Sequence, residues 1–162
     1  MTMALRRCFL AVALVALAPL TTACNSGGGA ATDGTAKPTV TIRSANGAHA
    51  FQVELARTAA EQQKGLMYRT DLKKDDGMLF APYPPEGGPP REASFWMENT
   101  PTPLDIIFIR PDGTIARIAE NTVPFDKTPI PSGEPVSAVL EIVGGRAAEL
   151  GIAEGDKVEL PK

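Results

Sequence analysis

The stretch IIFIRPDGTIARI, residues 106–118, predicts a β-hairpin. Two apolar segments rich in β-branched residues, 106–110 and 114–118, flank the turn signal Pro-Asp-Gly. Proline presets the backbone angle of the first turn position, and glycine accepts the positive φ that such a turn requires. This hairpin therefore favours a protein built from strands joined by turns.

Further strands are expected on both sides of the hairpin. Residues 39–43 (TVTIR) alternate β-branched and polar side chains, and Phe51, Val53 and Leu55 alternate with less apolar neighbours, which is typical of half-buried strands. Short apolar runs elsewhere predict the remaining strands. The full set of expected strands is 39–43, 51–56, 78–80, 93–97, 106–110, 114–118, 137–143 and 158–160.

Helical segments are short and few. Thr58 and Glu61 have the spacing of a capping box, which predicts a helix over 59–64 that ends at Gly65. Residues 147–150 are expected to form a helical turn. With no alternation of strands and longer helices, the sequence predicts a mainly β fold, namely a single antiparallel β-sandwich or barrel-like domain over residues 38–162 with one or two short helices.

Two proline-rich segments are expected to be loops. Residues 81–92 contain five prolines and two glycines, and residues 122–135 are also rich in proline. Proline has no backbone N–H and cannot donate to a central ladder. We therefore expect neither segment to form a strand.

The N-terminal part of the chain predicts export. Arg6 and Arg7 precede an apolar run at 8–20, which is typical of a signal peptide over residues 1–23. The string LTTAC resembles a bacterial lipoprotein signal, with Cys24 as the lipid attachment site and 24–37 as a flexible linker. The expected location is the periplasmic face of a membrane or, without the lipid, the free periplasm. The string RRCFL also resembles a twin-arginine signal, so the export route stays open.

Composition excludes several classes of chemistry. The chain has 16 Lys and Arg against 19 Asp and Glu and no basic run, which argues against a nucleic-acid partner. Its two cysteines, Cys8 and Cys24, precede the domain, so the domain has no thiol nucleophile or thiolate metal site. One histidine, His49, is too few for a zinc site. We expect no metal and no cofactor.

The segment FWMENTPTPLD, residues 95–105, holds the strongest candidate site. Trp96 is the sole tryptophan, and the prolines of this segment stiffen the chain between it and Asp105. An aromatic platform beside amides and carboxylates suits sugars and other polar small molecules. The candidate ligand-binding residues are Trp96, Asn99, Thr100 and Asp105. The alternative is structural, with Trp96 in the core and the polar groups bonded to loop backbone.

Two other sites are considered. Asp105 and Glu141 could form the acid and base of a carboxylate-based hydrolase. Met67, Met78 and Met97 could instead supply thioethers for an envelope copper site, although methionine also packs well in cores.

The segment from about Glu54 to Leu160 resembles the bacterial and archaeal family known as domain of unknown function 192. The matching stretches are GLMYR (65–69), GMLF (77–80), FWMENTPTPLDIIFI (95–109), AVLEI (138–142) and IAEGD (152–156). The resemblance implies a mostly β fold and a protein of a kind that is often secreted or lipid-anchored. It implies no activity. One departure is Glu98, which stands where the family usually has lysine.

The sequence thus predicts an exported cell-envelope protein that is a non-enzymatic binding module. Its expected ligand is a polar small molecule, a glycan or a protein partner.

Overall fold

The computed structural model describes residues 37–161, which contain nine strands and two helices. The expected signal peptide (1–23), Cys24 and the linker as far as residue 36 lie outside the described residues. In the described part, no helix is long and apolar enough to cross a membrane.

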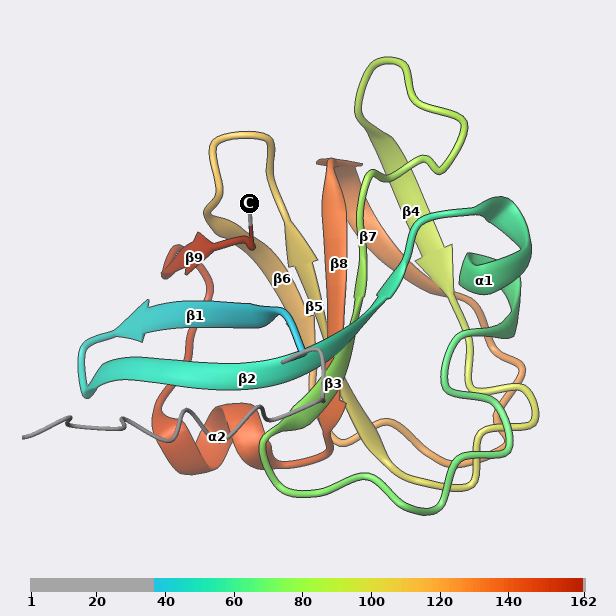
Figure 1. Cartoon of the computed structure of the whole chain (residues 1–162), viewed down its shortest axis with the longest axis horizontal. Helices are drawn as coiled ribbons and strands as arrows, with labels where there is room; N and C mark the ends of the chain where they lie inside the picture. Colours follow the sequence, from blue (N-terminus) through green and yellow to red (C-terminus); the bar gives the residue numbers. More distant parts are fainter. Residues whose placement is uncertain (1–36, 162) are drawn as a thin grey trace, which may run out of the picture. The chain divides into compact units, whose positions relative to one another are not determined.

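Seven strands form one strongly curved sheet (Figure 1). Its neighbours are antiparallel except for one pair, β2 and β3, which is parallel. The two edges nearly meet, because Val158 donates its backbone N–H to the carbonyl of Gly113 at 2.8 Å. The sheet is therefore close to a closed barrel, in the order β6 (Ile115–Ala119), β5 (Leu104–Ile109), β8 (Ala138–Val143), β3 (Asp76–Phe80), β2 (Gly47–Ala56), β1 (Thr39–Ser44) and β9 (Lys157–Glu159).

A second sheet holds only β4 (Arg91–Phe95) and β7 (Ile130–Val136). Figure 1 shows it on the side of the barrel away from the β1–β2 turn. The expectation that residues 122–135 form a loop is wrong for β7, which contains Pro131 and Pro135. Proline is excluded from central strands only, and each strand of a two-stranded sheet is an edge.

Both faces of the central strands are covered, which creates two hydrophobic cores. Along β8, Leu140 and Ile142 point into the barrel core, whereas Val139 points into a core beneath the small sheet. Side chains of a strand alternate between faces, so Glu141 shares the face of Val139. The second core also contains Ala56, Leu66, Met78, Phe80, Ala93, Met97, Leu104, Ile106, Phe108, Ala116 and Val136.

The helices are short, as expected. In α1 (Ala59–Lys64), Thr58 Oγ1 accepts from the Glu61 N–H at 3.3 Å, and Glu61 accepts from the Thr58 N–H at 2.8 Å. This confirms the capping box. The second helix is α2 (Arg146–Leu150). The predicted mainly β, barrel-like fold with short helices is confirmed, including the β5–β6 hairpin around Gly113.

Candidate functional site

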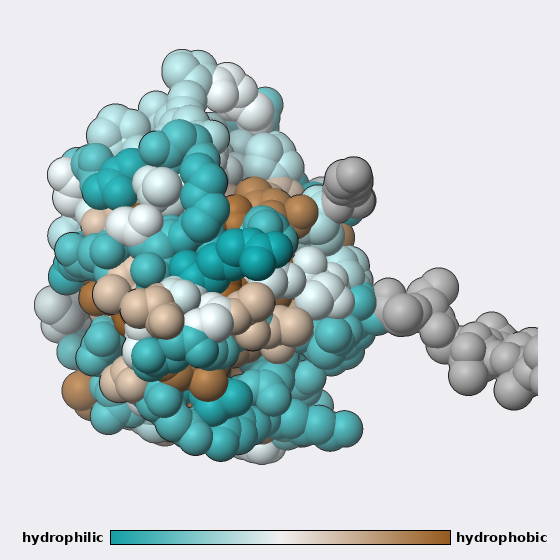
Figure 2. Space-filling model, turned by 90° about the vertical axis from the view of Figure 1, so that its left-hand side faces the viewer, coloured by the Kyte–Doolittle hydropathy of each residue, from teal (hydrophilic) through white to brown (hydrophobic). Residues whose placement is uncertain are grey.

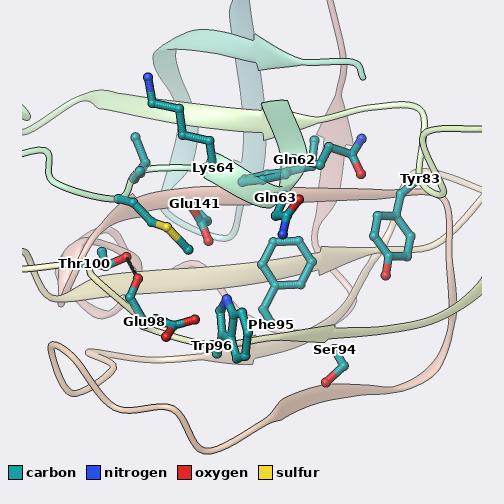
Figure 3. Close-up of a pocket in the computed structure, with 14 residues that line it drawn as sticks. Gln62, Gln63, Lys64, Tyr83, Ser94, Phe95, Trp96, Glu98, Thr100 and Glu141 are labelled. Carbon is teal, nitrogen blue, oxygen red and sulfur yellow. Dashed lines mark hydrogen bonds between the residues drawn. The ribbon is translucent and has the colours of Figure 1, made fainter. Parts of the chain in front are cut away.

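A hollow of about 220 Å³ opens between α1, the end of β4 and the middle of β8 (Figure 3). A second, more open hollow adjoins it over α1 and the chain that follows β4. By contrast, the end of the molecule with the β1–β2 turn is mostly hydrophilic, with scattered apolar spots (Figure 2). The main hollow is lined by Gln62, Gln63, Lys64, Gly65, Leu66, Met67, Phe80, Tyr83, Ser94, Phe95, Trp96, Glu98, Thr100 and Glu141.

Glu141 provides the floor of this hollow. It lies mid-strand in β8, paired with Met78 on one side and Ile106 on the other, and only 5% of the residue is exposed. Its Oε2 has no hydrogen-bond partner among the described residues. Burial among apolar side chains raises the pKa of Glu141 to about 8. The carboxyl group is therefore mostly protonated at neutral pH.

Aromatic side chains form the wall opposite the helix. Phe95 meets Phe80 and Phe108 edge to face, with ring centroids 5.0 Å and 5.9 Å away, so its ring is held rigidly. Trp96 follows directly after β4 and is 46% exposed. Figure 3 shows the indole of Trp96 and the carboxyl of Glu141 pointing into the same space.

Helix α1 supplies the amide groups of the site. The amide nitrogen of Gln62 donates to the carbonyls of Ala56 at 3.0 Å and Pro82 at 2.8 Å, which fixes the side chain. Gln62 Oε1 is buried and has no partner in the described part of the chain. Gln63 points into the hollow, whereas the ammonium of Lys64 points away from Glu141 (Figure 3).

Two loops are tied together where they border the hollow. The Tyr68 N–H donates to the carbonyl of Asn99 at 2.8 Å, and Thr102 Oγ1 donates to the carbonyl of Arg69 at 2.9 Å. Tyr68 and Asn99 both have positive φ, 63° and 54°, which is costly for residues other than glycine. These bonds hold Met67 and Glu98 in place on the two sides of the opening.

Ion pairs fix the base of the first loop. The Arg69 guanidinium donates to Asp71 at 2.7 Å and to Glu54 at 3.0 Å. These hydrogen bonds lower the pKa of both carboxyl groups and raise that of Arg69. Arg69 is thus occupied with holding the loop, and it does not line the hollow.

Three of the four candidate residues border the two hollows. Trp96 and Thr100 line the main hollow, and Asn99 lines the adjoining one beside Trp96. The Thr100 hydroxyl donates to the carbonyl of Glu98 at 3.1 Å. Asn99 donates from its amide nitrogen to the sulfur of Met67 at 3.9 Å. Trp96 is not in the core, so the structural alternative does not hold for it.

Asp105 lies away from the hollow, which corrects its place in the predicted site. It is fully buried in the opposite core, where one oxygen accepts from the N–H groups of Asn121 at 2.7 Å and Gly145 at 2.9 Å. The other oxygen accepts from the N–H of Ala147 at 2.7 Å, in the first turn of α2. Both carboxylate oxygens of Asp105 therefore already accept hydrogen bonds from backbone N–H groups.

The proposed hydrolase pair does not form. In the β5–β8 register, Asp105 lies opposite Ile142 and Ile106 lies opposite Glu141. The side chains of Asp105 and Glu141 therefore point to opposite faces of one sheet. No acid–base pair can act across that sheet.

The methionines also diverge. Met97 is fully buried and Met78 is 8% exposed, both in the core beneath the small sheet, and only Met67 lines the hollow. The structure does not bring three thioethers to an accessible point. Within residues 37–161, no group of three or more His, Cys, Asp or Glu side chains could hold a metal ion.

The sequence did not predict that Glu141 and Gln63 form one site with Trp96. Apolar neighbours mark Glu141 as facing away from Leu140 and Ile142, but they do not show what covers that face. At the rim, the Glu98 carboxylate accepts a hydrogen bond from the Lys127 ammonium at 2.6 Å. Glu98, which stands where the family usually has lysine, therefore has a cationic partner.

A family model, DUF192, described as uncharacterized ACR, matches residues 40–160. A crystal structure of a protein of unknown function from Novosphingobium aromaticivorans is 54% identical, with a TM-score of 0.70, and covers 75% of this chain and 83% of that one. A Sinorhizobium meliloti structure, named as a candidate transcription regulator, is 43% identical, with a TM-score of 0.70, and covers 76% and 93% respectively. No curated protein matches the chain.

Proposed function

This chain belongs to the DUF192 family, and on that premise we propose that it is a non-enzymatic binding module that holds a polar small molecule above Glu141. One observation carries the proposal, namely that the Glu141 carboxyl lines the hollow and has one buried oxygen without a partner among the described residues. Leaving such a group unpaired costs about 1 to 3 kcal/mol, which a leucine in its place would avoid. A ligand that hydrogen-bonds to Glu141 would remove that cost.

The dimensions of the hollow favour a small ligand. Its volume of about 220 Å³ is below the usual range for drug-sized ligands. It suits one small molecule or one end of a larger one, with the adjoining hollow beside Asn99 as the continuation. A glycan or a peptide would therefore place only one of its polar groups in the hollow.

We further propose that this module acts in the cell envelope, anchored through a lipid on Cys24. The proposal rests on the predicted signal peptide at 1–23 and on the Gly- and Ala-rich segment that is predicted to be a linker. The regulator name of the Sinorhizobium meliloti relative does not lead us to propose DNA binding, because this chain has an acidic balance and no basic run.

A fragment screen tests the binding function. The purified protein, labelled with ¹⁵N, is titrated with a set of small cationic, neutral and anionic polar compounds while backbone amide signals are recorded. Binding in the hollow shifts the amides of Gln63, Trp96 and Glu141 together. If none of the three charge classes shifts these amides, the binding proposal is wrong.

A further inference from the structure

We infer that the ligand of this hollow carries a protonated amine, which binds the carboxylate of Glu141 while its carbon skeleton lies against Trp96 and Phe95. The inference rests on the proposed binding function and names the chemical class of ligand. It follows from three features of the lining, namely its unpaired acceptors, its charges and its aromatic rings.

Once Glu141 is ionised, the unpaired buried groups of the lining need hydrogen-bond donors. Glu141 Oε2 and Gln62 Oε1 are both buried oxygens without partners among the described residues. The amide nitrogen of Gln62 is already used, so this side chain can only accept. An ammonium group offers three donors and no acceptor, which suits the carboxylate of Glu141.

The charges of the lining oppose an anion. Its titratable side chains are Lys64, Tyr83, Glu98 and Glu141. Lys64 is the only cation among them, and its ammonium points away from Glu141 (Figure 3). Glu98 adds a second carboxylate at the rim, held by Lys127 at 2.6 Å. A ligand ammonium would favour the carboxylate form of Glu141 and gain a counter-charge at the floor, whereas a ligand carboxylate would favour the neutral acid and gain no counter-charge there.

The aromatic side chains of the wall suit a cationic group attached to an apolar carbon skeleton. The rigid ring of Phe95 and the half-exposed indole of Trp96 present apolar surface to the hollow, and the indole nitrogen points into it (Figure 3). Cations are attracted to the π faces of aromatic rings, most strongly to tryptophan. The chain already shows this contact at the edge of the site, where the Arg91 guanidinium lies 5.8 Å from the ring centre of Tyr83.

Binding of an ammonium also requires a defined proton balance. Glu141, with its pKa raised to about 8, is mostly protonated at pH 7. The incoming ammonium keeps its own proton and favours the carboxylate, so the proton of Glu141 leaves to solvent. Each binding event at pH 7 should then release nearly one proton.

Three ligands of matched shape and different charge test the inference: benzylammonium, benzyl alcohol and benzoate. Isothermal titration calorimetry of the purified protein at pH 7, in buffers of different ionisation enthalpy, gives both affinity and proton release. We expect benzylammonium to bind about tenfold or more tightly than benzyl alcohol. Binding of benzylammonium should release nearly one proton per molecule bound, and benzoate should not bind.

Two variants test whether the preference for benzylammonium comes from Glu141 itself or from the overall negative charge of the protein. Glu141→Gln keeps the shape of the side chain, and it should abolish the preference for benzylammonium and its proton release. Glu92→Gln removes the same charge from an exposed position of β4 outside the hollow, and it should leave both unchanged.

Two results would overturn the inference. One is binding of benzyl alcohol at equal or higher affinity, which would leave the binding function standing with a neutral ligand. The other is failure of benzylammonium to bind while other fragments shift the amides of Trp96 and Glu141. If no fragment of any charge shifts those amides, the binding function itself has failed.

Discussion

The carboxyl groups of Asp105 and Glu141 lie on opposite faces of the same sheet, on adjacent strands β5 and β8. Asp105 accepts hydrogen bonds from the backbone N–H groups of Asn121, Gly145 and Ala147. Glu141 has an oxygen with no partner in the described chain and faces the hollow. The first carboxylate therefore stabilises the fold, and the second is available to a ligand.

Asp105→Asn should destabilise the protein without affecting the hollow. The amide nitrogen of asparagine cannot accept, so at least one N–H among its partners loses its acceptor. We expect a loss of about 2 to 4 kcal/mol in the free energy of unfolding, since these bonds go to a charged group. Urea denaturation measures the loss. An unchanged midpoint would show that Asp105 does not hold α2.

Glu141→Gln should change how stability depends on pH. The folded-state pKa of Glu141, about 8, lies above the ordinary glutamate value of 4.5, so the folded protein holds this proton more tightly than the unfolded chain does. The stabilising contribution of Glu141 is therefore fully present below pH 4.5 and is lost as pH rises towards 8. The cost above pH 8 is roughly 3 to 5 kcal/mol relative to the glutamine variant, which lacks the ionisation.

Thermal or urea unfolding of both proteins at a series of pH values measures this difference. The gap between wild type and Glu141→Gln should widen steadily between pH 5 and pH 8 and then level off. Parallel stability curves across that range would mean that Glu141 is solvated in the free protein.

Gly77→Ala should be strongly destabilising because β3 and β8 approach closely at this point. A Cβ at Gly77 would lie 2.5 Å from the carbonyl oxygen of Glu141. We expect a loss of about 2 to 4 kcal/mol, measured by urea denaturation. Gly87→Ala is the comparison, because nothing lies within 4 Å of its Cβ and only the positive φ of 77° adds a cost. A loss at Gly77 no larger than at Gly87 would refute the close approach.

Trp96→Ala should weaken binding far more than folding. The side chain is 46% exposed and borders both hollows, so its removal should cost about 1 kcal/mol of stability. Fragment affinity should fall about tenfold. In the wild type, acrylamide should quench the emission of this sole tryptophan, and a bound fragment should protect it. Equal quenching with and without bound fragment would place the ligand elsewhere.

Local sequence signals predicted most of the secondary structure. The Pro-Asp-Gly turn, the Thr58–Glu61 capping box and the alternation in β2 each depend on neighbouring residues only, and each is confirmed. Strand β7 was missed because the proline rule applies to central strands, and the sequence does not show that β7 pairs with β4 alone.

The site was harder to predict because it depends on register and on contacts distant in sequence. Trp96 and Thr100 were found because they stand in one stiff segment. The alternative of a hydrolase pair of Glu141 with Asp105 is open from the sequence, since alternation within β8 cannot show which residue of β5 lies opposite. The approach of α1 to β8 across the hollow has no local signal, so the role of Gln63 could not be predicted.

The most direct test is carbon-13 NMR of the Glu141 side-chain carboxyl, followed through a pH titration of the protein alone and with benzylammonium. We expect a midpoint near 8 in the free protein and a marked fall in the pKa of Glu141 when the ligand is bound. A carboxyl signal that titrates at the ordinary value of a glutamate, or that does not respond to any fragment bound by the protein, would contradict Glu141 as the floor of the binding site.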